Sequence, residues 1–141
     1  EEDNSTVTLD FDLILTELKF IQGRISKNTS ALVILDLNRD NAKHLLPFNS
    51  IAKRWGSSQL EFLAASRDGV KACEEFIRMS NATIQIPVAS DASFLEMTSS
   101  SKNRMVSVFK KDESDQLSLL WSGHVGSLEP CLDRCFGSDS D

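Results

Sequence analysis

Three cysteines and two histidines are the residues of this chain that could serve as nucleophiles or metal ligands. Cys131 and Cys135 stand four residues apart in a segment with helical spacing, so both would lie on one face of a helix. Two neighbouring thiols can form a redox-active disulfide, although one turn of a straight helix is a poor geometry for that bond. The same pair could instead be one core thiol and one semi-exposed thiol, or a structural disulfide in an oxidising compartment.

The other chemistry-bearing residues give weaker signals. Cys73 falls on the inward stripe of a predicted helix, and we expect a small core residue there rather than a catalytic one. A zinc site at the cysteine pair would need His44 and His124, whose spacing fits neither a metal cluster nor a catalytic triad. The chain has no glycine-rich phosphate loop, and its acidic cluster at 112–115 lacks the ligand spacing of a calcium loop. We therefore expect neither a metal nor another cofactor.

The composition is that of an ordinary folded domain, with 141 residues of which 40% are hydrophobic and 26% are charged. The net charge of −6 and the scattered Lys and Arg argue against a nucleic-acid partner, because phosphate binding needs a concentrated basic face. No apolar run approaches the ~20 residues of a membrane-spanning helix, so we expect no membrane insertion within this segment.

Hydrophobic patterns predict strands and helices in alternation through the middle of the chain. The apolar runs 31–37 and 60–65 have the composition of strands buried on both faces of a sheet. Each is followed by a predicted helix, at 41–55 and at 70–79, and Pro47 should kink the first of these. Short crossovers between buried strands imply parallel pairing with right-handed connections.

The N-terminal part gives a mixed pattern. Residues 6–11 alternate briefly, and residues 12–23 have helical spacing with Asp12 as the expected N-cap and Gly23 as the expected stop. A short helix, or a strand followed by a turn, would fit this pattern equally well. We predict a single domain over residues 6–136, with frayed termini at 1–5 and 137–141.

After residue 80 the period changes from helical to alternating. Apolar residues alternate around Pro87, which predicts a short extended segment, and 91–98 could form one or two helical turns. The strands predicted at 105–109 and 117–121 are separated by a polar turn, as in an antiparallel hairpin. Ser127 then caps a predicted final helix, whose apolar face is formed by Leu128, Leu132 and Phe136.

This order, a βαβ unit followed by a ββα unit, resembles the thioredoxin-like superfamily and in particular its TlpA-type, peroxiredoxin-related branch. The resemblance covers roughly residues 18–136 and implies an α/β fold with a central mixed sheet flanked by helices. It rests on the kinking Pro47, the strand 60–65 and its ending at Asp68-Gly69, Ile86-Pro87-Val88 followed by Asp91, and the segment Trp121 to Gly126.

Two departures remove the machinery of that family's disulfide chemistry. Its members carry a Cys-x-x-Cys pair whose second Cys precedes the kinking proline by five residues, and here the two positions are Arg39 and Ala42. Neither side chain can attack or resolve a disulfide. The family's cis-proline, which faces the cysteine pair, is also missing, since no proline lies near Asn103 to Met105. We therefore expect no ordinary thioredoxin catalysis and assign no catalytic residue.

The leading hypothesis is a redox-inactive thioredoxin-like domain that binds a protein partner, in docking, chaperoning or assembly. The resemblance implies a groove for an extended polypeptide beside the vacant cysteine positions. Arg39 at a helix N-terminus adds positive charge where the helix dipole is already positive, so an acidic ligand group would be favoured there. The candidate contact residues are Arg39, Asp40 and Asn41 at the helix start, with Lys102, Asn103, Arg104 and Met105 opposite.

Two alternatives remain open. One is an enzyme, an atypical thiol-disulfide oxidoreductase that uses Cys131 and Cys135. The other is a purely structural domain of a longer chain or complex, which is compatible with a sequence that begins without Met. The resemblance implies an extracytoplasmic location, in the periplasm, the secreted fraction or the lumen of the endoplasmic reticulum.

Overall fold

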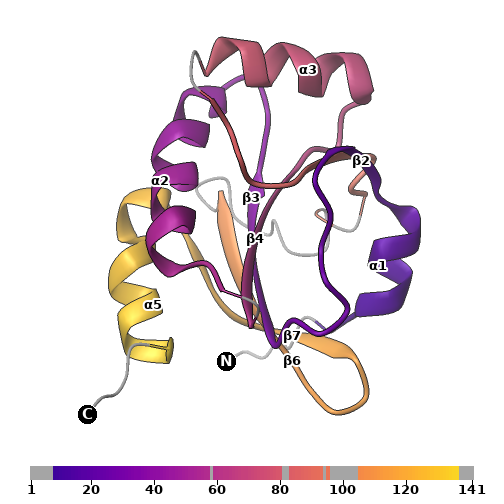
Figure 1. Ribbon diagram of the computed structural model, residues 1–141, viewed down its shortest axis with the longest axis vertical. Coiled ribbons are helices and arrows are strands. Elements are labelled where there is room, and N and C mark those ends of the chain that lie inside the picture. Colours follow the sequence, from indigo (N-terminus) through magenta and orange to yellow (C-terminus); the bar gives the residue numbers. More distant parts are fainter. Residues whose placement is uncertain (1–7, 58, 81–82, 94, 96–104, 137–141) are drawn as a thin grey trace, which may run out of the picture.

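Seven strands form one mixed sheet at the centre of the computed structural model, which describes residues 8–57, 59–80, 83–93, 95 and 105–136 (Figure 1). The strands are β1 (Thr8–Asp10), β2 (Lys19–Gln22), β3 (Ala31–Asp36), β4 (Leu60–Ala65), β5 (Val88–Ser90), β6 (Val106–Lys111) and β7 (Gln116–Gly123). Their order across the sheet is β1-β7-β6-β3-β4-β5-β2. The pairs β3–β4 and β4–β5 are parallel, and the other pairs are antiparallel.

The central strands bury both of their faces, as their apolar runs predict. All six residues of β3 are buried between its neighbours β4 and β6. Side chains of a strand alternate between the two faces, so Val33 and Leu35 enter one hydrophobic core while Leu32 and Ile34 enter the other. The predicted antiparallel hairpin is confirmed as β6 and β7.

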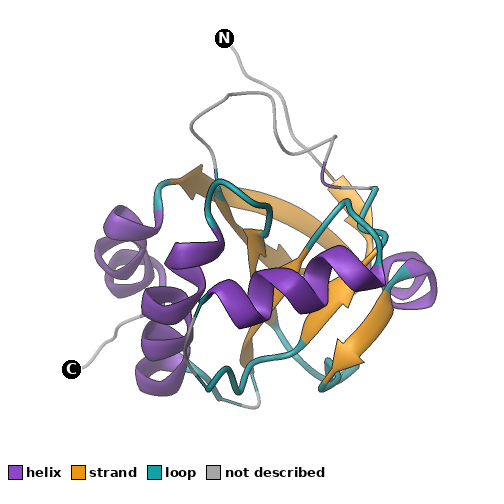
Figure 2. Cartoon of the chain, turned by 90° about the horizontal axis from the view of Figure 1, so that it is seen from above, coloured by secondary structure: helices purple, strands orange, loops and turns teal. Residues whose placement is uncertain are grey.

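Helices cover both faces of the sheet (Figure 2). Three of them, α2 (Leu45–Trp55), α3 (Val70–Met79) and α5 (Leu128–Phe136), contribute buried side chains to the core that contains Val33. The short helix α1 (Phe11–Glu17) contributes Phe11 and Ile14 to the opposite core. The expected arrangement of a βαβ unit and a ββα unit around a mixed sheet is thus observed, with β1 and β2 added at the two edges.

The predicted helix 41–55 is divided into two parts, so its first turn was predicted wrongly. A 3₁₀ turn, η2 (Ala42–His44), precedes α2, which begins at Leu45. Pro47 therefore lies in the first turn of α2, where its missing N–H would have no partner within the helix. The change of helix type before Pro47 takes the place of the expected kink.

The N-terminal segment contains a helix and a strand, whereas the pattern left either possible. Asp10, not Asp12, caps α1, because its carboxylate oxygen accepts from the Leu13 N–H at 3.3 Å. The helix ends at Glu17, so Gly23 follows β2 and is not a helix stop. Gly23 has a φ of +70°, a conformation that glycine adopts without steric cost.

Smaller differences occur elsewhere. Val70, expected to face inward, is exposed. The final helix begins at Leu128 after a 3₁₀ turn, η3 (Val125–Ser127), and the residue that caps this turn is His124 rather than Ser127. The predicted frayed termini and half of the residues in 91–98 lie outside the described residues. Within the described part, no helix is both long enough and apolar enough to span a bilayer.

Candidate functional site

The loop between β3 and α2 is closed by two asparagines that hold each other. The Asn38 N–H donates to Asn41 Oδ1 at 2.9 Å, and the Asn41 N–H donates to Asn38 Oδ1 at 3.0 Å. The Asn41 amide also donates to the carbonyl of Asp36, the last residue of β3. Because this small network satisfies the loop's polar groups internally, Arg39 and Asp40 are left exposed at the tip.

The predicted contact residues occupy different positions around this loop. Arg39 and Asp40 face solvent, whereas Asn41 is buried and is engaged in holding the loop. Met105 lies beside the end of β3, since its carbonyl accepts from the Asp36 N–H at 2.7 Å. Met105 is therefore near the loop, as expected for a residue opposite the helix start. The other three predicted residues, Lys102, Asn103 and Arg104, lie outside the described residues.

An ion pair that the sequence did not predict lies at the same end of β3 as this loop. Arg67 Nη2 is 3.1 Å from Asp36 Oδ2, and the Asp36 side chain is only 10% exposed. Asp36 ends β3 and Arg67 follows β4, its parallel neighbour, so their side chains meet where the carboxyl ends of the two strands align. The signal available in the sequence was an acidic residue at the end of one buried run, Asp36, and a basic residue shortly after the next, Arg67. The pair holds the buried Asp36 carboxylate at the end of β3, where the loop begins.

Two histidines meet beside the start of α2. The rings of His44 and His124 are 5.2 Å apart, edge to face. His124 Nδ1 accepts from the Gly126 N–H at 3.0 Å. Burial, reinforced by the charges of His124 and Lys43, lowers the pKa of His44, so the neutral imidazole is favoured there. Sequence spacing could not reveal this contact, because the two residues belong to distant parts of the chain.

Among the described residues, no group of three or more His, Cys, Asp or Glu side chains is placed to hold a metal ion. The three cysteines lie on α3 and α5. The loop and its surroundings can therefore offer charge and hydrogen bonds to a ligand.

The thiols of α5 differ sharply in their environments. Cys131 is 1% exposed, whereas Cys135 is exposed, and neither is in a disulfide. Burial, followed by the negative charge of Cys135 and a hydrogen bond with it, raises the pKa of Cys131 to about 11. Cys73 on α3 is fully buried, and burial also raises the pKa of its thiol. Since the thiolate is the reactive form, Cys135 is the thiol best placed for chemistry.

The two candidate sites lie at opposite ends of β3. A cavity of about 530 Å³ is lined by Cys135 together with Ser30 and Ala31, where β3 begins. The Arg39 loop follows the other end of the same strand. The sequence reasoning treated the cysteine pair and the loop as separate sites, and the structure does not bring them together.

Comparison with known proteins identifies the fold. No protein-family model and no curated protein matches this sequence. Solved structures do: a mutant of Xanthomonas campestris peroxiredoxin Q has 17% identity and a TM-score of 0.61, over 89% of this chain and 90% of that one. A Xylella fastidiosa PrxQ mutant has 18% identity and a TM-score of 0.61, over 96% of each chain.

A third similar structure is a thiol-disulfide isomerase from Corynebacterium glutamicum, with 12% identity and a TM-score of 0.57, over 86% of this chain and 92% of that one. These likenesses show that the chain has the thioredoxin-like fold, as the sequence resemblance implies. At such low identity they establish the fold alone, because one fold can carry many different functions.

Proposed function

We propose that this domain is a redox-inactive thioredoxin-like module that binds a protein partner through the loop between β3 and α2. The observation that carries the proposal is the construction of that loop. The interlocked Asn38 and Asn41 hold Arg39 and Asp40 out into solvent. The resemblance places the family's Cys-x-x-Cys motif at this segment, from Arg39 to Ala42. A rigid loop that presents charged side chains suits recognition, because little ordering entropy is lost on binding.

The charge around the loop favours a partner with an acidic group. Arg39 and Lys43 are both exposed, and neither forms an ion pair with another described residue. They provide positive charge beside a helix start in a chain whose net charge is −6. An extended acidic segment could then lie across the loop toward Met105.

A quantitative binding comparison tests this function. Wild-type protein, Arg39→Glu and the matched control Lys71→Glu, an exposed lysine on α3, would be immobilised and exposed to extract from the source cells. We expect a specific partner to be recovered equally by wild type and Lys71→Glu and at least fivefold less by Arg39→Glu, because the reversed charge would repel its acidic group. Equal recovery by all three proteins would contradict the proposal.

A thiol-disulfide oxidoreductase is the second candidate, and two observations favour it. The thiols of Cys131 and Cys135 are close enough for the charge of Cys135 to raise the pKa of Cys131, and the similar folds include a peroxiredoxin and a thiol-disulfide isomerase. The Cys135 thiolate would attack a substrate disulfide, forming a mixed disulfide and releasing one substrate thiolate. Cys131 would then lose its proton and attack the Cys135 sulfur, forming the Cys131–Cys135 disulfide and releasing the second substrate thiolate. The raised pKa of Cys131 opposes this second step.

Thiol trapping with mass spectrometry separates the two candidates. The binding module predicts that Cys135 reacts first with iodoacetamide at neutral pH, that Cys131 and Cys73 react only on unfolding, and that insulin is not reduced. The oxidoreductase predicts one reversible Cys131–Cys135 disulfide with a potential of roughly −120 to −270 mV. It also predicts insulin reduction that is lost in Cys135→Ser and kept in Cys73→Ser. The second result would replace the first proposal.

A further inference from the structure

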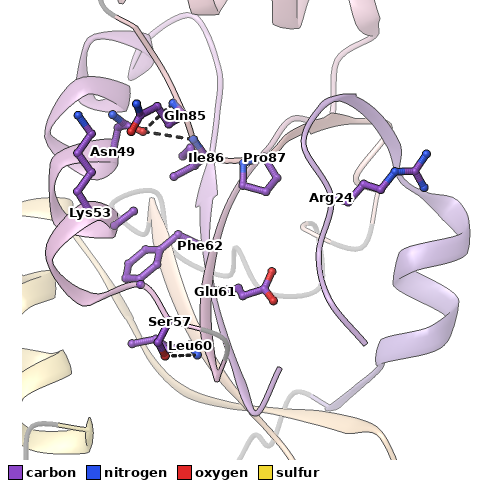
Figure 3. A pocket seen from close by; sticks show the side chains of 12 residues that line it. Arg24, Asn49, Lys53, Ser57, Leu60, Glu61, Phe62, Gln85, Ile86 and Pro87 are labelled. Atoms are coloured by element: carbon purple, nitrogen blue, oxygen red, sulfur yellow. Dashed lines mark hydrogen bonds between the residues drawn. The ribbon is translucent and has the colours of Figure 1, made fainter. Parts of the chain in front are cut away.

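A small cavity lies beside the first residues of β4, before the point where β4 pairs with β5, and it is separate from the loop that follows β3. Its volume is about 290 Å³, and it lies between the start of β4, the C-terminal half of α2 and the chain that precedes β5 (Figure 3). Lys53 of α2 and Arg24, which follows β2, stand on its two sides. Phe62 and Pro87 also line it.

The backbone of β4 has an unpaired position at this cavity. The Ala64 N–H donates to the carbonyl of Pro87 at 3.0 Å, and the Ser66 N–H donates to the carbonyl of Ala89 at 3.0 Å. Alternate residues of a strand point their N–H and C=O groups to the same side, so those of Phe62 face this edge too. β5 begins only at Val88, and no residue in the described ranges supplies a partner for the Phe62 groups.

The next position along the same edge is already closed. The Ser57 N–H donates to the Leu60 carbonyl at 2.9 Å, and Ser57 Oγ accepts from the Leu60 N–H at 3.2 Å. The gap is therefore one residue long, between the capped Leu60 and the paired Ala64. One residue of an added antiparallel strand would fill it, because an antiparallel pair exchanges both N–H···O bonds.

Hydrogen bonds fix the two segments on either side of the gap. Asn49 of α2 is 2% exposed, and its Oδ1 accepts from the Gln85 N–H at 3.0 Å and from the Ile86 N–H at 3.3 Å. These bonds keep the chain before β5 against α2 and away from β4. On the other side, both carboxylate oxygens of Glu61 lie 3.2 Å from the Ser26 nitrogen and accept its N–H. The structure thus keeps a space of about 290 Å³ between two fixed segments.

The charge at this space is positive. Lys53 and Arg24 supply two positive charges and Glu61 one negative charge, so the three sum to +1 in a chain of net charge −6. In Figure 3 the Arg24 guanidinium turns outward, while Lys53 rises along α2 at the mouth of the cavity. A carboxylate would gain from this local charge. The apolar surface of Ile86 and Pro87 offers contact to a small aliphatic side chain.

We propose that this gap binds the C-terminal end of a polypeptide in an extended conformation. One residue of that end would exchange two hydrogen bonds with the Phe62 N–H and C=O, and the terminal carboxylate would lie near Lys53. This is the chemistry of adding a strand to an exposed sheet edge, combined with capture of a chain terminus. The site is separate from the Arg39 loop and would exist whether or not that loop binds a partner.

The test is a titration of isotope-labelled full-length chain with the peptide N-acetyl-Ala-Val-Ala, followed by amide NMR. We expect the Phe62 amide resonance to shift and saturate. The same peptide with a C-terminal amide, or with a methylated valine nitrogen, should bind at least fivefold more weakly, because each change removes one of the proposed interactions. Lys53→Gln should raise the Kd roughly threefold, and the control Lys71→Gln should leave it unchanged.

Either of two results would overturn the inference. One is a Phe62 resonance that stays unmoved at millimolar peptide. The other is equal binding of all three peptides, which would mean that neither the chain end nor the strand pairing is recognised. Arg39→Glu should bind this peptide like wild type, so failure here and failure of the proposed loop function are distinguishable.

Discussion

At the scale of single residues, the feature that most affects the candidate site is the contact between His44 and His124. Histidine is the side chain whose charge changes near neutral pH, and burial makes the charged form of His44 less favourable. The two rings pack edge to face beside the start of α2, and the neutral form of His44 is favoured there. If both imidazoles were protonated, two positive charges would lie next to each other, with Lys43 as a third positive group.

This contact predicts a pH dependence of stability. The pKa of His44 is lower in the folded chain than its ordinary value of 6.5, so the unfolded chain binds more protons below that pH. The free energy of unfolding should fall as the pH drops from 6.5 to the folded pKa, and become independent of His44 below it. Urea unfolding at pH 7.5, 6.5 and 5.5 measures this.

The control for this prediction is His44→Gln, which removes the titrating group and keeps a polar side chain. The variant should lose less stability than wild type between pH 6.5 and 5.5. Parallel stability curves for the two proteins would show that His44 does not contribute.

At the scale of elements, the junction between β2 and β5 depends on one glycine. Gly23 has a φ of +70°, and a Cβ atom there would lie 2.9 Å from the Pro87 Cα. By contrast, Gly69 is the N-cap of α3 with extended backbone, and nothing lies within 4 Å of the place where its Cβ would be. The two glycines are therefore opposite cases, one required by the structure and one replaceable.

Substitution at these two positions should change stability in opposite directions. Gly23→Ala should lower the free energy of unfolding by about 2 kcal/mol, from the left-handed backbone and the clash with Pro87. Gly69→Ser should raise it by roughly 0.5 kcal/mol, because serine caps α3 and restricts the unfolded chain. Chemical denaturation of both variants checks this, and a Gly23→Ala protein as stable as wild type would contradict it.

Elements with a dense apolar signal could be predicted from the sequence, and those defined by local hydrogen bonds could not. The buried apolar runs predicted β3 and β4 as central strands, and α3 was predicted with its observed bounds. The division of 41–55 into η2 and α2, with Pro47 in the first turn of α2, is a local change of helix type that periodicity does not resolve. β1, with three residues, is too short to give a clear alternation.

At the scale of the whole molecule, the fold could be predicted from the order of strands and helices along the chain. Much of the candidate site could not be predicted in this way. The Asp36–Arg67 pair and the histidine contact join residues that only the sheet order brings together. Arg39, Asp40 and Asn41 were predicted from the resemblance, which places the family's cysteine motif at the start of the helix predicted at 41–55. The gap at Phe62 could not be predicted, since it depends on where β5 begins relative to β4.

The sheet order predicts a gradient of stability across the molecule. β3 lies between two long pairings, with β4 and with β6, and its residues are buried on both faces. β1 and β2 each pair on one side, through three or four residues. Amide hydrogen exchange should therefore be slowest in β3 and fastest in β1 and β2. Equal protection of β2 and β3 would show that the sheet opens only as a whole.

The position of α1 has a consequence for how the chain is made. This helix joins β1 and β2, which lie at opposite edges of the sheet and are neighbours in sequence. β1 pairs with β7 and β2 pairs with β5, so both partners are synthesised after the strands that need them. During translation β2 has no partner strand until β5 leaves the ribosome, and β1 has none until β7 does. β1 therefore waits longer for its partner strand than β2 does.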